Sequence, residues 1–391
     1  MERFTVNLLE DPTMYSNTFG RMFRLTTYGE SHGPGLGGVV DGCPAGLELA
    51  DADLQKALDE RRPGPSVTGG AAASPRREAD RVRLLSGVFK GRTTGAPIAF
   101  HVDNTNQRSE DYEALAQVFR PGHADLGFQA KYGIRDHRGG GRSSGRETIG
   151  RVAGGAVAQA FLAAEGVTVL ACALELGGRV APLTDVAGAS SRPYFCPDAA
   201  TVPAWQALLE QAKNEGDSMG GLVRVEIHGL PPGLGEPVFD KLDARLAYAF
   251  MGVGAVKGVE IGAGFVAARR KGSENNDPIL PADAEAPVPG GVLRGQGKED
   301  VGYAFATNNA GGVLGGMSTG APVVVTAAVK PIASISKDQH TVTTGGKARI
   351  IQVGGRHDVS AIPRIVPVLK AMAALTAADF ILLQRGARLA P

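Results

Sequence analysis

Several features that would mark common protein classes are scarce or missing in this sequence. It has only 3 cysteines in 391 residues, Cys43, Cys172 and Cys196. Their wide spacing argues against a disulfide framework or a paired-cysteine zinc site, so we expect reduced, structural thiols. No uninterrupted apolar run reaches the roughly 18 residues that span a bilayer. The start, MERFTVNLLEDPTMYS, carries acidic residues where a signal peptide would be apolar. We therefore expect a cytoplasmic protein with no membrane partner.

Charge of one sign and several catalytic motifs are also missing. The net charge is only +1 and aromatic residues make up 6% of the chain, whereas nucleic-acid-binding proteins usually combine broad positive charge with aromatic stacking residues. The sequence has no HExxH pattern, no GxSxG elbow, no P-loop and no GxGxxG opening a βαβ unit. These absences disfavour metal-dependent hydrolysis and Rossmann-type redox chemistry, and we expect no bound metal.

The pattern of apolar residues predicts an α+β fold. Helices are expected at 147–164, 202–214, 240–251 and 362–385, and strands at 167–176, 221–229 and 321–330. Strands and helices do not alternate regularly, which makes a doubly wound parallel sheet the weaker interpretation. The Pro-rich segment 271–299 is expected to be a long loop.

Two pairs of similar segments occur in the same order along the chain. Segment 41–62 resembles 228–250, and 93–102 resembles 318–329. We therefore expect an internally duplicated β-α-β sandwich, with antiparallel sheets around a helical core. Residues 17–391 would form one domain of two pseudo-symmetric halves. Residues 1–16 would be an N-terminal extension, and translation is hypothesised to begin at Met14.

One segment is far more basic than the rest of the chain. Residues 120–151 contain seven cations and three anions, which indicates a site for a multiply charged anion. Its GGG run leads through Ser144 and Glu147, a capping-box pattern, into the expected helix, whose N-terminus favours an anion beside Arg142 and Arg146. An ordinary capped helix with solvated arginines explains this segment equally well.

Histidines and further anion-binding elements lie outside or next to this segment. Histidine titrates near neutral pH, so it can donate or accept a proton. His32 in GESHG and His123 in RPGHAD stand beside glycines or an arginine, whereas a lone histidine is more often structural. The elements ERRPGPS (60–66), NNAGGVLGGMSTG (308–320), KPIAS (330–334) and GGRHD (354–358) are each nonspecific alone.

Together these motifs resemble the chorismate synthase family. The resemblance is carried by GESHGPGLGGVVDGCPAG (29–46), by RPGHAD, KYG and GGGRSSGRET (120–148), and by GRHDVSAIP (355–363), with RREADRVRLLSGVFKGRTTG, GDSMGG, GLGEPVFDKLDA and AVKGVEIG between them in the family's order. It extends from Asn17 to about Arg385, nearly the whole chain, and such an ordered series of long motifs is highly specific.

The resemblance implies a lyase of the shikimate pathway, which leads to the aromatic amino acids. Such an enzyme removes phosphate from 5-enolpyruvylshikimate 3-phosphate by anti-1,4-elimination, with reduced FMN as cofactor. His32 would assist phosphate departure, His123 would protonate the reduced flavin, and Asp358 would help the flavin N5 act as a base. Ser31 and Ser144 would take part in proton relays. The substrate-binding arginines would be Arg61, Arg120, Arg146 and Arg356. Flavin contacts would fall on Arg142, Ser143, Ser144, Ala255, Gly315, Lys330, Pro331, Ile332, Ala333, Ser334 and Arg356.

The sequence departs from the family pattern at several of these positions. Val67 stands where an arginine is usual, and Arg76 or Arg77 is the candidate replacement. Gly254 replaces a larger residue, and Ile332 and Ala333 replace hydroxyl residues. The family also implies a homotetramer. Because segment 271–299 is long and Pro-rich, we further hypothesise that it orders when the flavin binds. Some members reduce their own flavin with NADPH; we expect an external flavin reductase, because no nicotinamide motif occurs.

Two other functions fit the same residues. One is a nucleic-acid-binding protein, suggested by the Arg/Gly-rich segment, although charge and aromatic content oppose it. The other is a flavin-free enzyme that acts on a phosphorylated sugar acid with the same arginines and histidines.

Overall fold

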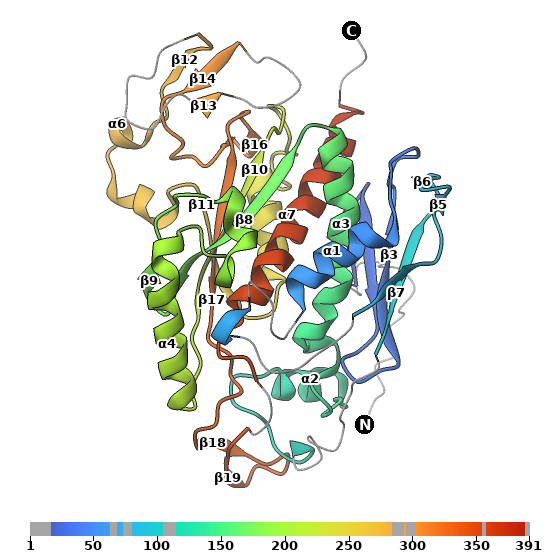
Figure 1. The fold of residues 1–391 in the computed structure, drawn as a ribbon, viewed down its shortest axis with the longest axis vertical. Coiled ribbons are helices and arrows are strands. Elements are labelled where there is room, and N and C mark those ends of the chain that lie inside the picture. Colours follow the sequence, from blue (N-terminus) through green and yellow to red (C-terminus); the bar gives the residue numbers. More distant parts are fainter. Residues whose placement is uncertain are drawn as a thin grey trace, which may run out of the picture.

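The fold consists of two antiparallel sheets with helices packed between them (Figure 1). The computed structural model describes residues 17–62, 69–72, 80–104, 115–283, 293–294, 302–353 and 357–387. The first five-stranded sheet has the order β1-β2-β3-β7-β4. These strands are β1 (Thr18–Phe19), β2 (Arg24–Tyr28), β3 (Gly35–Asp41), β7 (Ile98–Asp103) and β4 (Val82–Leu84).

The second five-stranded sheet has the order β11-β17-β10-β8-β9. Its strands are β11 (Val256–Ile261), β17 (Val323–Val329), β10 (Gly221–His228), β8 (Thr168–Leu176) and β9 (Arg179–Val180). Val225 of β10 lies opposite Val325 and Ala171 on its two neighbours. The three expected strands are therefore confirmed as β8, β10 and β17. Every strand pair within the two described sheets is antiparallel, and the α+β prediction is confirmed.

The helical layer consists of α1 (Asp51–Arg61), α3 (Thr148–Ala164), α5 (Leu242–Met251) and α7 (Ile362–Gln384). Helices α3 and α7 lie against each other, and a Cβ atom on Gly155 would stand 2.3 Å from that of Ala371, so only glycine permits this approach. Helix α7 has the length and mean hydropathy (1.8) of a membrane span, yet 89% of its most apolar window is buried. A helix that is apolar on all sides suits such a core position.

The two sheets share one connectivity. The first is built in the order β2, β3, α1, β4, β7, and α3 follows; the second is built in the order β8, β10, α5, β11, β17, and α7 follows. In both sheets, the third of these strands pairs with the outer side of the fourth. The similar segments 41–62 and 228–250 lead from β3 into α1 and from β10 into α5.

The remaining elements lie around this sandwich. They are α2 (Asp125–Tyr132), α4 (Val202–Asn214), α6 (Gly272–Asn275), β5 (Val88–Phe89), β6 (Arg92–Thr93), β12 (Ile279–Pro281), β13 (Leu293–Arg294), β14 (Tyr303–Phe305), β15 (Val313–Leu314), β16 (Met317–Ser318), β18 (Gln339–Val342) and β19 (Ala348–Ile351). The four helices expected from the sequence are confirmed as α3, α4, α5 and α7.

Segment 271–299 differs from the expected structureless loop. It contains α6 and two strands, β12 and β13, which pair with the two sides of β14. The prolines concealed these strands in the sequence, because β12 is an edge strand and an edge tolerates proline, here Pro281. Part of this segment lies outside the described residues, so the hypothesis that it orders with flavin stays a prediction. The expected extension 1–16, with Met14, lies entirely outside the described residues.

Candidate active site

The loop at 139–147 is the centre of the candidate site. Gly139, Gly140 and Gly141 have φ values of 75°, 89° and 53°, a region that glycine enters without strain. Two 3₁₀ turns follow, Gly141–Ser143 and Gly145–Glu147, before α3 begins at Thr148. The chain thus enters the sandwich through a tight, glycine-built turn.

The capping box predicted here forms only in part. Ser144 Oγ accepts a hydrogen bond from the Arg146 amide at 3.3 Å, so Ser144 caps the second 3₁₀ turn. Glu147 instead accepts from Arg151 Nε at 2.7 Å, one helical turn further on. A guanidinium is a stronger partner for a carboxylate than a backbone amide is. The predicted hydrogen bond from the Ser144 amide to the Glu147 carboxylate is therefore wrong.

His32 and Ser31 lie against this loop. A Cβ atom placed on Gly139 would stand 2.8 Å from both Cδ2 and Nε2 of His32 and 3.0 Å from Ser31 Oγ. Ser31 is buried, its Oγ donates to the Arg138 carbonyl at 3.3 Å, and its own carbonyl accepts from Asn104 Nδ2 at 2.7 Å. The half-buried His32 ring is therefore placed directly on the glycine turn.

Two of the predicted substrate-binding arginines share one buried carboxylate. Arg61 NH1 lies 3.3 Å from Asp80 Oδ2, and Arg146 NH2 lies 2.9 Å from Asp80 Oδ1. Arg61 also donates to Thr148 Oγ1 at 3.0 Å and to the Gly145 carbonyl at 2.8 Å. These contacts join the end of α1 to the 139–147 loop.

A third predicted arginine, Arg120, has its own carboxylate. Its Nε lies 2.8 Å from Asp125 Oδ2 and its NH2 lies 2.8 Å from Asp125 Oδ1, so the pair is bidentate. Arg135 NH1 lies 3.6 Å from Asp125 Oδ1. Burial alone raises the pKa of Asp125, but the hydrogen bonds from Arg120 and the charges of both arginines outweigh it, so this pKa lies below its ordinary value. A Cβ on Gly140 would be 3.7 Å from Arg120 NH2, so Arg120 borders the same loop.

The turn after Arg120 meets the segment 330–334. His123 Nε2 lies 2.9 Å from Ser334 Oγ, and Lys330 Nζ donates to the Gly122 carbonyl at 2.8 Å. Burial lowers the pKa of His123, and the charges of Arg120 and Lys330 lower it further. The Ala255 carbonyl accepts from the Lys330 amide at 2.9 Å. This second group of predicted residues thus adjoins the first through residues 120–123.

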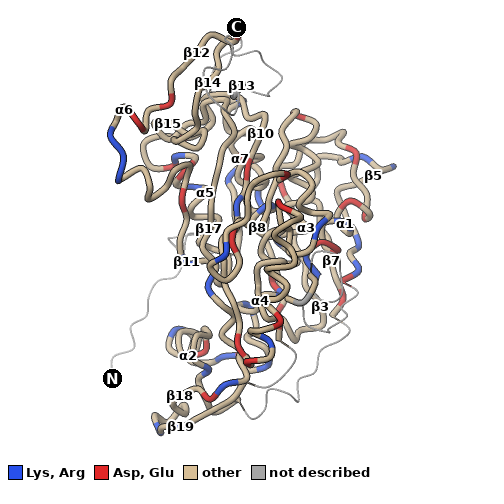
Figure 2. The backbone as a smooth tube through the Cα atoms, turned by 60° about the vertical axis from the view of Figure 1, so that its left-hand side comes forward, with Lys and Arg blue, Asp and Glu red and all other residues tan. Residues whose placement is uncertain are grey.

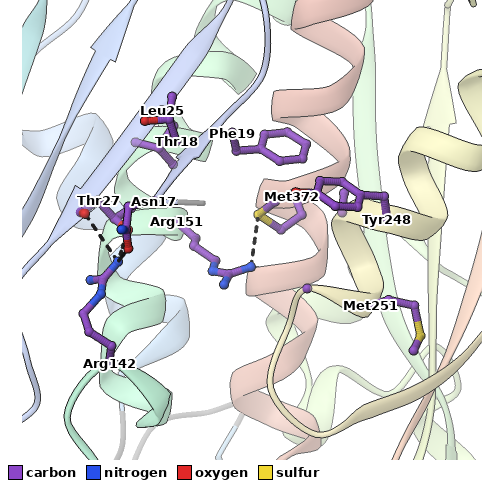
Figure 3. A pocket seen from close by; sticks show the side chains of 12 residues that line it. Asn17, Thr18, Phe19, Leu25, Thr27, Arg142, Arg151, Tyr248, Met251 and Met372 are labelled. Carbon is purple, nitrogen blue, oxygen red and sulfur yellow. Dashed lines mark hydrogen bonds between the residues drawn. The ribbon is translucent and has the colours of Figure 1, made fainter. Parts of the chain in front are cut away.

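Arg142 makes its hydrogen bonds to residues at or beside β1 and β2. It donates to the Gly29 carbonyl and, at 2.7 Å, to Thr27 Oγ1, with Asn17 also in reach (Figure 3). It lines a pocket of about 460 Å³ between β2 and α5, and a second pocket of about 520 Å³ on the α2 side of the loop. Neither of these two pockets is lined by His32 or His123. Arg142 therefore ties the 139–147 loop to β2, and a flavin contact there stays a prediction.

Asp358 is linked to the 330–334 segment through a motif of the sequence. In GDSMGG, Ser218 Oγ donates to the Ile332 carbonyl at 2.6 Å, and the amide of the next residue, Met219, donates to the Val359 carbonyl at 2.9 Å. The Asp358 carboxylate is held by Arg364 at 2.8 Å. Asp358 therefore lies one residue from Val359, whose carbonyl contacts the motif that reaches the 330–334 segment.

Not every predicted contact residue joins the cluster. Gly315 lies in the turn between β15 and β16, at the opposite end of β17 from Lys330. A seven-residue strand separates them, a span of about 20 Å at the usual rise of about 3.3 Å per residue. Val67, Arg76, Arg77 and Arg356 lie outside the described residues.

Sequence reasoning missed the carboxylates that hold the arginines. Asp80 and Asp125 both occur within quoted motifs, RREADRVRLLSGVFKGRTTG and RPGHAD. The signal that could have found them is electrostatic: buried arginines need a counter-charge, and Asp125 is five residues from Arg120. Nothing in the sequence pairs Asp80 with Arg146, 66 positions away.

Comparisons with known proteins identify the family of this chain. The chorismate synthase family model matches residues 23–382. A chorismate synthase of Oleidesulfovibrio alaskensis is 62% identical over 372 residues, covering 95% of this chain and 98% of the relative. One of Syntrophobacter fumaroxidans is 54% identical and covers 94% and 98%. A crystal structure of chorismate synthase superimposes with a TM-score of 0.71 at 30% identity, covering 94% of both chains. This chain belongs to the chorismate synthase family.

Proposed function

We propose that the cluster around the 139–147 loop is the site at which this chain converts 5-enolpyruvylshikimate 3-phosphate into chorismate and phosphate. The observation that carries this proposal is that Arg61, Arg146, Arg120 and His32 all border one glycine-built turn. The substrate bears two carboxylates and a phosphate, and guanidinium groups match such oxyanions in charge and geometry.

The residues at 330–334 and 139–147 fit the phosphate-bearing flavin that the family uses. Lys330 Nζ and Ser334 Oγ are donors suited to a phosphate, and Ser143 is exposed beside the glycine turn. Gly122 leaves room where a Cβ would meet Ala333 at 2.7 Å. We assign reduced FMN to these residues, together with Ala255, Pro331 and Ile332. When bound, it supplies electron density to the substrate transiently, so that the reaction is redox-neutral overall.

The chain's own residues bind, orient and move protons. The arginines hold the anionic substrate, and positive charge near the leaving group stabilises the charge that develops there. We propose that His32 donates a proton to the departing phosphate. Its ring lies against Gly139, where a side chain would displace it. The buried setting of Ser31 and Arg120 keeps water from this part of the site.

His123 and Asp358 have the remaining proton-transfer roles in this proposal. The Nδ1 atom of His123 lies 3.0 Å from the Pro121 carbonyl, which can only accept a hydrogen bond, so Nδ1 carries a proton. Nε2 is therefore the atom that exchanges a proton, through or beside Ser334. The Asp358 carboxylate, held by Arg364, is the proposed final acceptor of the proton that the substrate loses.

We also propose how the chain is organised and how it assembles. The shared connectivity of the two sheets supports an internal duplication, within one domain formed by residues 17–391. We propose a cytoplasmic homotetramer whose flavin is reduced by a separate reductase. Acidic and basic residues are interspersed over the molecule in Figure 2, which favours a small anionic substrate over nucleic acid.

An anaerobic assay tests this function. Purified chain is mixed with 5-enolpyruvylshikimate 3-phosphate and chemically reduced FMN, and chorismate absorbance and phosphate release are followed together. Equal amounts of both products are expected. Phosphate release without any need for flavin would favour the sugar-acid alternative, and absence of turnover by folded protein would refute the proposal.

A further inference from the structure

Asp80 is a buried carboxylate shared by two arginines from different parts of the chain. Its side chain is 0% exposed, against 1% for Arg61 and 12% for Arg146. It stands just before β4, whereas Arg61 ends α1 and Arg146 lies in the 3₁₀ turn before α3. One carboxylate therefore connects three elements at the edge of the candidate site.

The two arginines are held in different ways. Arg61 uses Nε, NH1 and NH2 on Thr148, Asp80 and Gly145, all atoms of the protein. Arg146 is the more exposed of the pair and reaches Asp80 through NH2. Arg61 thus anchors the carboxylate to the scaffold, and Arg146 is the member that can face an anion in the site.

The negative charge of Asp80 stabilises the close approach of the two arginines. Two guanidinium groups this close together repel each other, and among the described residues the shared Asp80 carboxylate links them and offsets part of this repulsion. Removing one partner of a buried ion pair leaves uncompensated charge, which is strongly unfavourable. Without the Asp80 charge, Arg146 is expected to turn toward solvent.

The backbone of Asp80 is also fixed. Gln55 of α1 donates from Nε2 to the Asp80 carbonyl at 3.2 Å and accepts from the Val82 amide at 3.0 Å. Asp80 has a φ of 39°, an uncommon value for a residue other than glycine. Such a conformation persists only where the surroundings impose it, so the carboxylate has little freedom to move.

We propose that Asp80 is a positioning residue that holds Arg146 in the orientation that binds the anionic substrate. Asp80 itself touches neither substrate nor flavin, and it acts through Arg146. This inference rests on the proposed function and adds to it the residue that sets the direction of one substrate-binding arginine.

The test is a substrate-binding measurement on full-length protein with oxidised FMN, in which no turnover occurs. Calorimetry gives the Kd of 5-enolpyruvylshikimate 3-phosphate for wild type, Asp80→Asn, Arg146→Gln and the double variant. Asp103→Asn is the matched control, because Asp103 forms an exposed ion pair with Arg83, 58% and 57% exposed. The Kd of FMN and the melting temperature are measured for each.

Asp80→Asn is expected to weaken substrate binding by about tenfold or more, with FMN affinity within about twofold of wild type, because only an anion-binding arginine is displaced. In the Arg146→Gln background, the same change is expected to add less than about twofold, since coupled residues are not additive. Asp103→Asn should match wild type.

Unchanged substrate affinity in Asp80→Asn, or additive effects in the double variant, would overturn the proposal. A parallel loss of FMN affinity and melting temperature would show a merely structural role. If Asp80→Asn does not fold, the Arg146→Gln variant is used instead, because Asp80 and Arg61 remain a neutral pair in it. Wild-type substrate affinity in Arg146→Gln would refute the inference. Absence of substrate binding by wild type would instead refute the proposed function.

Discussion

His123 Nε2 and Ser334 Oγ lie 2.9 Å apart, although 211 positions separate the two residues in the sequence. Because Nδ1 donates to the Pro121 carbonyl, Nε2 of the neutral ring accepts the hydrogen bond from the Ser334 hydroxyl. This contact joins the arginine-rich segment to the segment assigned to flavin, and it fixes which ring nitrogen faces that segment.

The pKa of His123 is predicted to lie below its ordinary value of 6.5, because of burial first and of the Arg120 and Lys330 charges next. The unfolded chain then binds more protons than the native protein as pH falls through 6.5, so this histidine favours folding above that pH and opposes it below. NMR titration of the ring should show a midpoint under 6.5 that rises in Lys330→Gln. A midpoint above 6.5 would contradict the account.

Asp125→Asn is predicted to destabilise the protein by about 3–5 kcal/mol, because it leaves Arg120 buried without its counter-charge. Both side chains are at most 6% exposed. Denaturant unfolding measures the effect, and Asp103→Asn should lose far less. Equal losses in the two variants would mean that the Arg120 pair contributes no more than a surface contact.

The stability that Asp125 contributes depends on pH. A lowered pKa means that Asp125 contributes stability above its unfolded value, near 3.8, and that this contribution is lost as pH falls through the native pKa. Acid unfolding below pH 4 should therefore be shallower in Asp125→Asn than in wild type.

Gly139→Ala is predicted to reduce turnover at least tenfold, because the new Cβ would lie 2.8 Å from the His32 ring. Gly91→Ala is the matched control. Its φ of 76° is close to the 75° of Gly139, but no atom lies within 4 Å of the added carbon. Both changes should cost about 1 kcal/mol of stability. Equal turnover in the two variants would argue against a catalytic His32.

Lys330→Met is predicted to weaken FMN binding by about tenfold, since it removes a charged donor from the phosphate. Fluorescence quenching of oxidised FMN measures the affinity, and Lys90→Met, at an exposed position on a β5–β6 turn, serves as control. Unchanged affinity in Lys330→Met would exclude the 330–334 segment as the phosphate contact.

Local patterns were sufficient to predict much of the fold. The apolar periodicity of α4 and the β-branched run of β17 are local properties, and both elements form where expected. Strands β12 and β13 were missed because they have only 3 and 2 residues and lie in a Pro-rich segment that resembles a loop. Pairing partners are a property of the folded chain.

In the candidate site, too, residues marked by their local sequence could be predicted, whereas residues brought together only by folding could not. His32, Arg120 and His123 could be singled out because glycines and arginines surround them in sequence. Asp80 could not, since its role arises from the meeting of α1, β4 and the 139–147 loop. Glu147 misled the prediction because Arg151, one turn later, is the better partner.

Single-turnover phosphate release shows whether His32 is the general acid of the reaction. Wild type, His32→Ala and His340→Ala are each mixed anaerobically with substrate and reduced FMN; His340 is exposed on β18 and outside the cluster. Loss of a general acid typically slows a reaction by about 10²–10⁴-fold. We expect His32→Ala to slow phosphate release within this range, whereas His340→Ala keeps the wild-type rate. A wild-type rate in His32→Ala would contradict the assignment of this cluster as the active site.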